Sequence, residues 1–149
     1  MIRRATVDDV VMLARLHFDT VSVAYRSFFP DVLPDDLTPF LELWVRDVSS
    51  AHAVFVLDGV ASSVARANGD LARLHVHPSR WGEGLGQRMH DVAVDELRAC
   101  GHARAGLWVI ERNERARSLY ERNGWVLDDS VPPLHEAGVR EVRYVLDLT

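Results

Sequence analysis

The residues with the clearest chemical meaning lie in one segment, LHVHPSRWGEGLGQ, from Leu74 to Gln87. Its apolar strand pattern ends at a proline, and the glycines Gly82, Gly84 and Gly86 then lead into a helical pattern. Glycines let successive backbone amides turn towards one point, and the start of a helix adds partial positive charge. The segment therefore predicts a binding site for a phosphate-bearing ligand.

Two common nucleotide-binding motifs do not match this segment. A Walker loop ends in Gly-Lys-Ser or Gly-Lys-Thr, and neither tripeptide occurs in the chain. The Rossmann fingerprint requires the spacing G-x-G-x-x-G inside a βαβ unit, whereas the spacing here is G-x-G-x-G. One alternative without a ligand stays open, in which the glycines only build tight turns.

A three-stranded antiparallel meander precedes the glycine segment. From His52 onward the pattern alternates with a period of two, and the turn pairs Asp58-Gly59 and Asn68-Gly69 separate its strands. Helical spacing of apolar residues predicts helices before and after this meander. The expected helices begin near Val7 with Thr6 as the cap, at Thr38 with Pro39 in the first turn, after Gly86, and at an Asn113 cap.

Further strands are expected at both ends of the chain. They cover Ile2 to Arg4, Ala105 to Ile110, Trp125 to Asp129 and Val139 to Leu148, the last two separated by a Pro-Pro loop. Helices that interrupt a largely antiparallel sheet define an α+β or mixed α/β fold class. The whole chain, 1–149, is expected to be one domain, because 149 residues with 48% apolar content suit a single core.

Composition and charge exclude several classes of partner. With a net charge of −5, the protein lacks the broad positive field that binds the phosphates of nucleic acid. We therefore expect no nucleic-acid partner. No stretch approaches the roughly 20 apolar residues of a membrane helix, and the charged N-terminus does not resemble a signal peptide. We therefore expect no membrane partner and a cytoplasmic location.

A second motif follows the glycine segment at a fixed distance. In LWVIERNERARSLYERNGW a strand is followed by Asn113, then Ala116 and Tyr120, then the pair Gly124-Trp125. Together, the two motifs resemble the signatures of the GNAT superfamily of acyl-CoA-dependent N-acetyltransferases. That resemblance covers the whole chain and implies a central, twisted, mostly antiparallel sheet of about seven strands flanked by about four helices. It also implies that strands four and five splay apart.

The resemblance implies acetyl-CoA as the acyl donor and assigns residues to it. The backbone amides of Gly82, Glu83, Gly84, Leu85, Gly86 and Gln87 would bind the pyrophosphate. The main chain of Leu74, His75 and Val76 would pair with the pantetheine arm, which Asn113 would also contact. Trp81 stands where the family usually has Arg or Gln, and we interpret it as a packing residue or a contact on the adenine side.

The resemblance also implies catalytic roles. Tyr120 would be the general acid that protonates the departing thiolate, since a phenol of pKa about 10 stays protonated at neutral pH. Asp70 is the closest match to the family's carboxylate base, and Glu111, a histidine or a relayed water are the alternatives. A structural role stays open for both residues: Tyr120 as a core aromatic and Asp70 as a solvated turn carboxylate.

The acceptor is expected to be an amine of a small molecule or of a protein N-terminus, acylated by direct attack. Its site is expected between Val21 and Asp36, with Tyr25, Phe28 and Phe29, and in the loop from Ser130 to Gly138, with His135 and Glu136. His75 and His77 alternate like a metal pair, but no third ligand has a suitable spacing, so we expect no metal.

Two further expectations concern the function and assembly of the chain. The same fold could serve a non-catalytic acyl-CoA-binding regulatory module, which is the alternative to an enzyme. An exposed sheet edge at the C-terminal strand is consistent with a homodimer.

Overall fold

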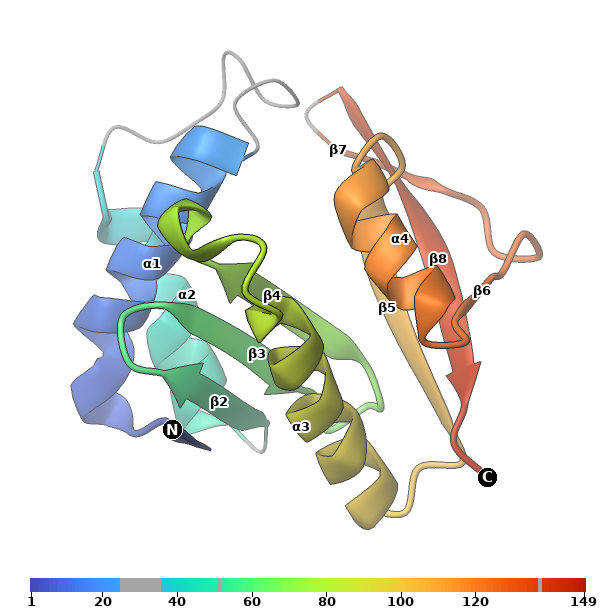
Figure 1. Cartoon of the computed structure of the whole chain (residues 1–149), viewed down its shortest axis with the longest axis horizontal. Helices are drawn as coiled ribbons and strands as arrows, with labels where there is room; N and C mark the ends of the chain where they lie inside the picture. The colour runs from blue at the N-terminus through green and yellow to red at the C-terminus, as the bar shows by residue number, and fades with distance from the viewer. Residues whose placement is uncertain (25–35, 51, 137) are drawn as a thin grey trace.

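A computed structural model describes residues 1–24, 36–50, 52–136 and 138–149. The chain forms two antiparallel sheets with helices packed on their faces, as Figure 1 shows. The predicted mixed α/β architecture is confirmed, but its strands are divided between two sheets. The elements are β1 (Ile2–Arg4), α1 (Val10–Ala24), α2 (Thr38–Ser49), β2 (Ala53–Leu57), β3 (Ala61–Ala65), β4 (Leu71–Val76), α3 (Leu85–Ala99), β5 (Arg104–Ile110), α4 (Glu114–Arg122), β6 (Val126–Leu127), β7 (Leu134–Glu136) and β8 (Val139–Asp147), with single 3₁₀ turns at Val7–Asp9 and Pro78–Arg80.

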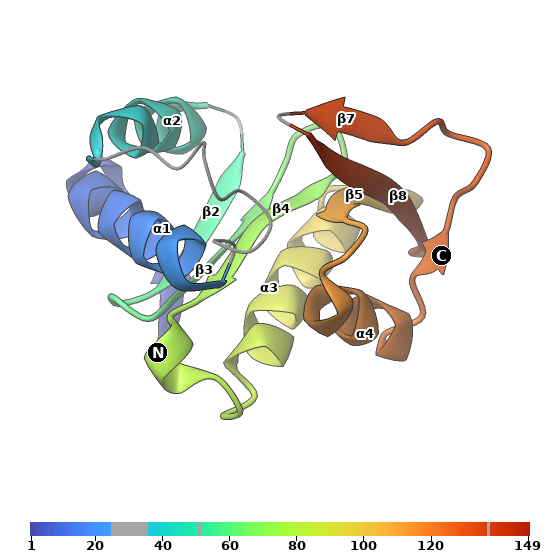
Figure 2. The same ribbon diagram turned by 90° about the horizontal axis from the view of Figure 1, so that it is seen from above.

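The first sheet has the strand order β1-β2-β3-β4, and its last three strands are the predicted meander. Its two faces follow the period of two in the sequence. Val54 and Val56 pack with α1 and α2 on one face, while Ala53 and Phe55 pack with α3 on the other. Figure 2 shows α1 and α2 on the side of this sheet opposite to α3. The meander is thus buried on both faces.

The second sheet has the order β5-β8-β6, with β7 also paired to β8. The C-terminal strand β8 pairs with β5 on one side and with β6 and β7 on the other. The expectation of an exposed edge at this strand is therefore wrong, because β7 forms inside the segment that we expected to be a Pro-Pro loop. The outer strands of this sheet are β5, β6 and β7.

In the described part of the chain, the strands of the two sheets pair at one point. A lone parallel bridge joins Asp70, at the start of β4, to Gly106 in β5, where the Gly106 amide donates to the Gly69 carbonyl at 3.3 Å. Beyond this bridge β4 and β5 diverge, and α3 and α4 lie on either side of the gap (Figure 1). The predicted splay between the fourth and fifth strands is confirmed. It leaves the edge of β4 that faces β5 without a neighbouring strand after Asp70.

Local capping agrees with the sequence in two of three places. The Thr6 amide donates to Asp9 at 2.8 Å, and the Asn113 side chain accepts from the Ala116 amide at 3.2 Å. The second helix has Pro39 in its first turn as predicted, but its cap is wrong by one residue, since the N-cap is Leu37 and Thr38 is the first residue of α2. The Thr38 amide donates to the side chain of Asp36 at 2.8 Å. Among the described residues, no helix is both long and apolar enough to cross a bilayer.

Candidate active site

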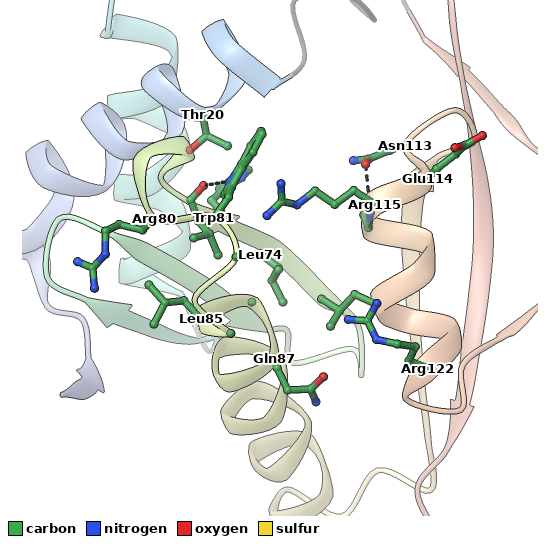
Figure 3. A pocket seen from close by; sticks show the side chains of 17 residues that line it. Thr20, Leu74, Arg80, Trp81, Leu85, Gln87, Asn113, Glu114, Arg115 and Arg122 are labelled. Atoms are coloured by element: carbon green, nitrogen blue, oxygen red, sulfur yellow. Dashed lines mark hydrogen bonds between the residues drawn. The ribbon is translucent and has the colours of Figure 1, made fainter.

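A cavity of about 610 Å³ lies where β4 and β5 diverge. One wall comes from β4, the glycine loop and the start of α3, and the other comes from α4 (Figure 3). It brings together every residue that the sequence assigned to the cofactor except Glu83. These lining residues are Leu74, His75, Val76, Trp81, Gly82, Gly84, Leu85, Gly86, Gln87 and Asn113.

The glycine loop has the backbone geometry that the sequence indicated. Gly82 and Gly84 have φ angles of 84° and 77°, in the left-handed region that favours glycine. A Cβ placed on either residue would meet no atom within 4 Å, so the space beside the loop is open. Gly84 is the N-cap residue of α3, and the positive end of that helix faces the cavity. The loop is thus suited to an anion.

Three arginines add positive charge around the loop. Arg80, Arg115 and Arg122 all line the cavity, and Arg80 is paired with Glu83 at 2.7 Å. Glu83 itself does not line the cavity. In Figure 3, Arg80 is directed away from α4, whereas Arg115 extends from α4 towards Trp81. A ligand carrying several phosphate groups fits this charge distribution.

Trp81 connects the two walls of the cavity. Its indole Nε1 donates to the Val76 carbonyl at 2.9 Å, and the guanidinium carbon of Arg115 lies 3.9 Å from the centre of its ring. The second contact is a cation–π interaction between the β4–α3 loop and α4. The sequence assigned the main chain of Val76 to the pantetheine arm, and the carbonyl of this residue is therefore already hydrogen-bonded to Trp81.

Tyr120 does not line the cavity. Its side chain is 8% exposed and packs against Trp125 and Tyr144, with ring centres 5.9 and 6.5 Å away. Ala116 and Leu119, on the same helix, do line the cavity. The general-acid role of Tyr120 stays a prediction.

Asp70 is held in an ion pair at the junction of the sheets. Both of its carboxylate oxygens accept from Arg143, at 2.8 and 3.0 Å, and the two side chains are about four-fifths buried, with exposures of 18% and 20%. Glu111, the alternative carboxylate, is paired with Arg140 at 3.0 Å. The role of Asp70 as a base stays a prediction, and its geometry is that of a group which fixes β4 to the second sheet.

A second cavity, of about 450 Å³, lies on the other side of β4 and contains Asp70. It is more polar than the first, with charged side chains from both sheets. Its lining includes His17, Arg66, Asp70, Arg73, His75, Trp108 and Glu141. Of the described residues, His75 is the only one that lines both cavities.

His75 is buried against α1. Its ring stacks on that of His17 with centres 4.4 Å apart, and Trp44 donates to His17 Nδ1 at 3.2 Å. Burial is the main cause that lowers the pKa of His75 to about 3 and that of His17 to about 2. The positive charge of Arg73 lowers both pKa values further. Both rings are thus neutral at physiological pH.

The residues expected to bind the acceptor are mostly not tested by the geometry. Tyr25, Phe28 and Phe29 lie outside the described residues. His135 and Glu136 are on strand β7 and not in a loop, and His135 is exposed. His77 does not pair with His75, because its ring accepts from the Ser79 amide in the turn after β4. Within the described part of the chain, no group of three or more potential metal ligands gathers.

Comparison with known proteins identifies the family. The model of the acetyltransferase (GNAT) family matches residues 18–125. The chain belongs to the GNAT family. This confirms the predicted family, a family of acetyltransferases that use acetyl-CoA as the donor.

Individual relatives agree with this family. Over 59 residues the chain is 46% identical to a mycothiol acetyltransferase of Beutenbergia cavernae, a match that covers 40% of this chain and only 20% of that relative. The structure of yncA from Salmonella typhimurium with its cofactor acetyl-CoA has a TM-score of 0.72 and 17% identity, covering 100% of this chain and 94% of the other. A ribosomal-protein-alanine N-acetyltransferase from Brucella melitensis has a TM-score of 0.75 and 17% identity, with 99% of each chain covered. At these identities the two structures show the GNAT fold alone.

Sequence reasoning missed the arginines that α4 contributes to this GNAT cavity. Arg115 and Arg122 are seven residues apart, which places them on the same face of a helix two turns apart. That spacing was the available signal. Sequence reasoning also missed the role of His17. A single histidine in an apolar helical stripe indicates a core residue, and the pattern does not show which strand that residue will contact.

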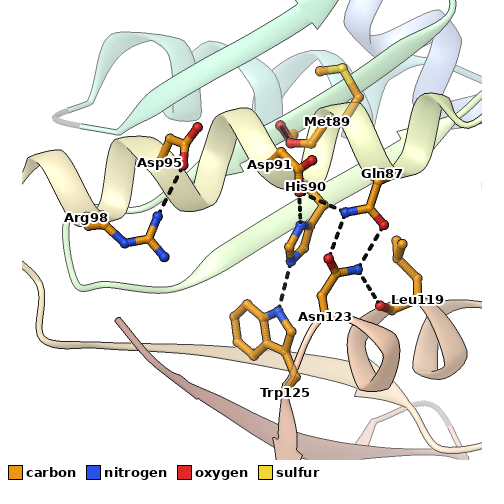
Figure 4. A network of polar contacts seen from close by, with 10 residues as sticks. Gln87, Met89, His90, Asp91, Asp95, Arg98, Leu119, Asn123 and Trp125 are labelled. Atoms are coloured by element: carbon orange, nitrogen blue, oxygen red, sulfur yellow. Dashed lines mark hydrogen bonds and ion pairs between the residues drawn. The ribbon is translucent and has the colours of Figure 1, made fainter. Parts of the chain in front are cut away.

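The start of α3 is fastened to the end of α4 by side chains. The amides of Gln87 and Asn123 exchange two hydrogen bonds, of 2.7 and 2.9 Å, and Trp125 Nε1 donates to His90 at 2.9 Å (Figure 4). The Gln87 side chain is therefore engaged in packing the helices together. The contact that the sequence predicted for Gln87 is through its backbone amide, which these side-chain bonds do not occupy.

Proposed function

We propose that the protein transfers an acetyl or other short acyl group from acyl-CoA to a primary amine, by direct attack of the amine. The acceptor would be a small molecule or a protein N-terminus, and the protein would act in the cytoplasm. The observation that carries the proposal is the first cavity. It joins an anion-binding glycine loop to the unpaired edge of β4, so one ligand with a phosphate end and an amide-containing arm fits both parts.

Acetyl-CoA would supply the thioester whose acyl group is transferred. The glycine loop, with Arg115 and Arg122, would hold the phosphates by backbone amides and charge. The main chain of Leu74 to Val76 would align the arm along β4, and Asn113 would border it at the start of α4. Tyr120 would supply a proton to the departing thiolate.

The first experiment measures acetyl-CoA binding by calorimetry to the wild type and to Gly84→Glu. A carboxylate in the glycine loop should repel the phosphates, and the affinity should fall by at least about 100-fold, because an unpaired like charge costs several kcal/mol. Gly59→Glu is the matched control. Gly59 has a similar φ of 71° and equally open surroundings, but it lies in the turn between β2 and β3.

The outcomes of this titration separate clearly. Loss of binding in Gly84→Glu with retention in Gly59→Glu supports the proposed cofactor site. Failure of the wild type to bind acetyl-CoA would overturn the proposal. Equal losses in both variants would show that strain at a left-handed glycine, and not the cofactor site, explains the result.

A second candidate function is a non-catalytic acyl-CoA-binding module. The observation that favours it is the pairing of Asp70 with Arg143, which leaves no unpaired carboxylate among the predicted bases. Tyr120→Phe distinguishes the two functions, because it keeps the ring and removes the proton. For an enzyme, turnover should fall by about 100-fold or more while acetyl-CoA still binds. A binding module would show no turnover in the wild type.

A homodimer remains part of the proposal, at a different edge from the one first expected. The outer strands β6 and β7 carry exposed apolar side chains, namely Val126, Leu127 and Leu134. Light scattering of the wild type and of Leu127→Glu tests this assembly. A dimer that persists unchanged in the variant would contradict an interface at this edge.

A further inference from the structure

Two arginines of α4, Arg115 and Arg122, line the first cavity without a carboxylate partner. Arg115 lies over the ring of Trp81, and within the residues that the structure describes neither guanidinium forms an ion pair. Figure 3 shows both side chains on the side of α4 that borders the cavity. A guanidinium group has donors and no acceptor, so its strongest partners are carboxylates and phosphates. The two arginines therefore favour an anionic ligand in this cavity.

The glycine loop by itself does not balance the charge of acyl-CoA. Its charged side chains, Arg80 and Glu83, are paired with each other, and the start of α3 contributes only about half a positive charge. The 3′-phosphate on the ribose of CoA adds about 1.5 to 2 negative charges at pH 7, as other phosphate monoesters do, to those of the pyrophosphate. Among the described residues, Arg115 and Arg122 are the other cations that line the cavity. Glu114 borders it too, but Figure 3 shows its carboxylate directed away from the glycine loop.

The two arginines lie beside different ends of the glycine loop. Arg115 contacts Trp81, which stands directly before the loop and is hydrogen-bonded back to β4. Arg122 precedes Asn123, whose side chain exchanges hydrogen bonds with Gln87 in the first turn of α3, directly after the loop. Along α4 the two residues are separated by a rise of about 10 Å. We therefore expect them to contact different parts of one ligand.

The order of groups along acyl-CoA assigns a part to each arginine. The pantetheine arm is proposed to follow β4, which precedes the loop, so Arg115 lies on the side of the arm. The nucleoside begins at the other end of the pyrophosphate, and its 3′-phosphate lies one ribose ring further on. Arg122, beside the start of α3, is the lining cation on that side.

We propose that Arg122 binds the 3′-phosphate of acyl-CoA, so that the protein selects CoA thioesters over thioesters without this phosphate. The inference rests on the proposed acyl-CoA site and adds a residue that sets donor specificity. An arginine can direct two parallel N–H groups at one phosphate, which combines charge with a fixed geometry. An acyl group on the phosphopantetheine arm of a carrier protein lacks the 3′-phosphate and is therefore a poor donor.

A role of Arg122 confined to the helix makes a different prediction. Arg122 stands in the last turn of α4, where a positive charge stabilises the helix dipole. That stabilisation does not depend on which thioester occupies the cavity. A comparison of two ligands that differ only in the 3′-phosphate therefore separates the two roles.

Calorimetry with acetyl-CoA and acetyl-3′-dephospho-CoA measures this selectivity. The wild type should bind acetyl-CoA about tenfold more tightly, the lower part of the range for a charge-assisted hydrogen bond, because Arg122 is exposed. Arg122→Gln should reduce the ratio of the two dissociation constants to about one or two, by weakening acetyl-CoA alone. Arg122→Lys keeps the charge and loses the paired donors, so its ratio should lie between the two.

Two further variants are matched controls with the same change of charge. Arg115→Gln removes the cation at the other end of the loop and should weaken both thioesters by the same factor. Arg15→Gln removes an exposed cation from α1, which lies on the side of the first sheet opposite to α3. It should leave both affinities within about twofold of the wild type, because exposed charges far apart are screened by salt.

The outcomes distinguish this inference from the function on which it rests. Equal affinities of the wild type for the two thioesters, or an unchanged ratio in Arg122→Gln, would overturn the role of Arg122 and leave the acyl-CoA site intact. A ratio lost in Arg115→Gln and kept in Arg122→Gln would overturn it as well. An unchanged ratio with a lower melting temperature in Arg122→Gln would assign Arg122 to the helix alone. A wild type that binds neither thioester would overturn the proposed function, and the role of Arg122 with it.

Discussion

The two ends of the gap between β4 and β5 are held together in different ways. At the closed end, main-chain pairing between Asp70 and Gly106 is reinforced by the two hydrogen bonds from Arg143. At the open end, side chains connect the walls among the residues that the structure describes, through Gln87 with Asn123 and Trp81 with Arg115. Where two strands diverge, their backbone N–H and C=O groups have no hydrogen-bond partner in the sheet, and another group must satisfy them. The difference indicates that the closed end serves stability and the open end serves binding.

The largest expected effect concerns pH and the buried rings of His17 and His75. Their pKa values in the folded protein, about 2 and about 3, lie below the ordinary value of 6.5, so only the unfolded chain binds these protons at mildly acidic pH. The contribution of each neutral ring to the free energy of unfolding is fully present above about pH 7. It falls as the pH drops through 6.5, by at most about 1.4 kcal/mol per pH unit for each ring. Asp9, whose pKa is lowered to about 2, loses its contribution only below its ordinary value of 3.8.

Urea denaturation between about pH 7 and pH 4.5 measures this effect, since no aspartate with a lowered pKa interferes in that window. The double variant His17→Phe, His75→Leu should show a markedly flatter dependence. An unchanged slope in the double variant would show that other groups cause the loss at acidic pH.

The next effect compares a glycine at each end of the gap. A Cβ at Gly106 would lie 2.6 Å from Arg143 Cζ and 3.0 Å from Asp70 Oδ1, so Gly106→Ala should displace the guanidinium and break the ion pair. We expect a loss of about 2–3 kcal/mol, below the full value for a buried pair because both side chains are partly exposed. At the open end, a Cβ at Gly86 meets Leu119 Cδ2 at 3.7 Å and Val76 Cγ2 at 3.9 Å, which are ordinary contacts. Gly86→Ala should raise helix stability by up to about 1 kcal/mol.

Chemical denaturation of the two variants tests the comparison directly. Opposite signs of the stability change would support the division into a structural and a binding end. If Gly106→Ala were neutral, the closed end would not depend on the position of Arg143.

A smaller effect is expected for the contact between Gln87 and Asn123. A double-mutant cycle with Gln87→Ala and Asn123→Ala should give a coupling free energy of about 0.5–1.5 kcal/mol, typical of hydrogen bonds between partly buried amides. Asp95→Ala, which breaks the exposed pair with Arg98 on the same helix α3, is the control and should change stability by less than about 0.5 kcal/mol. No coupling in the cycle would mean that α3 and α4 are held only by apolar contacts.

The smallest effect concerns Trp81 and the edge of β4. Trp81→Phe keeps an aromatic ring for Arg115 and removes the donor to the Val76 carbonyl. If the cofactor arm pairs with that carbonyl, calorimetry should show acetyl-CoA binding up to about tenfold more tightly, the value of one hydrogen bond. Weaker binding would indicate that the indole N–H itself contacts the cofactor.

Local patterns in the sequence were sufficient for the meander, the α3 glycine loop and the cap at Asn113. In each case the turn chemistry and the period of apolar residues act over a few neighbouring positions. Local patterns also identified the residues assigned to the cofactor, nearly all of which line one cavity in the structure. The glycine loop, the end of β4 and the start of α4 are each marked by a short motif. Strand β7 escaped prediction, since its three residues pair only through contact with β8.

The sequence by itself determined the family, the fold class and the anion-binding loop, because these depend on residue types at fixed short spacings. Only the tertiary structure decided that Asp70 meets Arg143, 73 residues away, and that His75 meets His17 across α1 and β4. Burial and long-range pairing set the charge state of those groups, and neither can be read from neighbours along the chain. The charge states of these buried groups are therefore a property of the folded molecule.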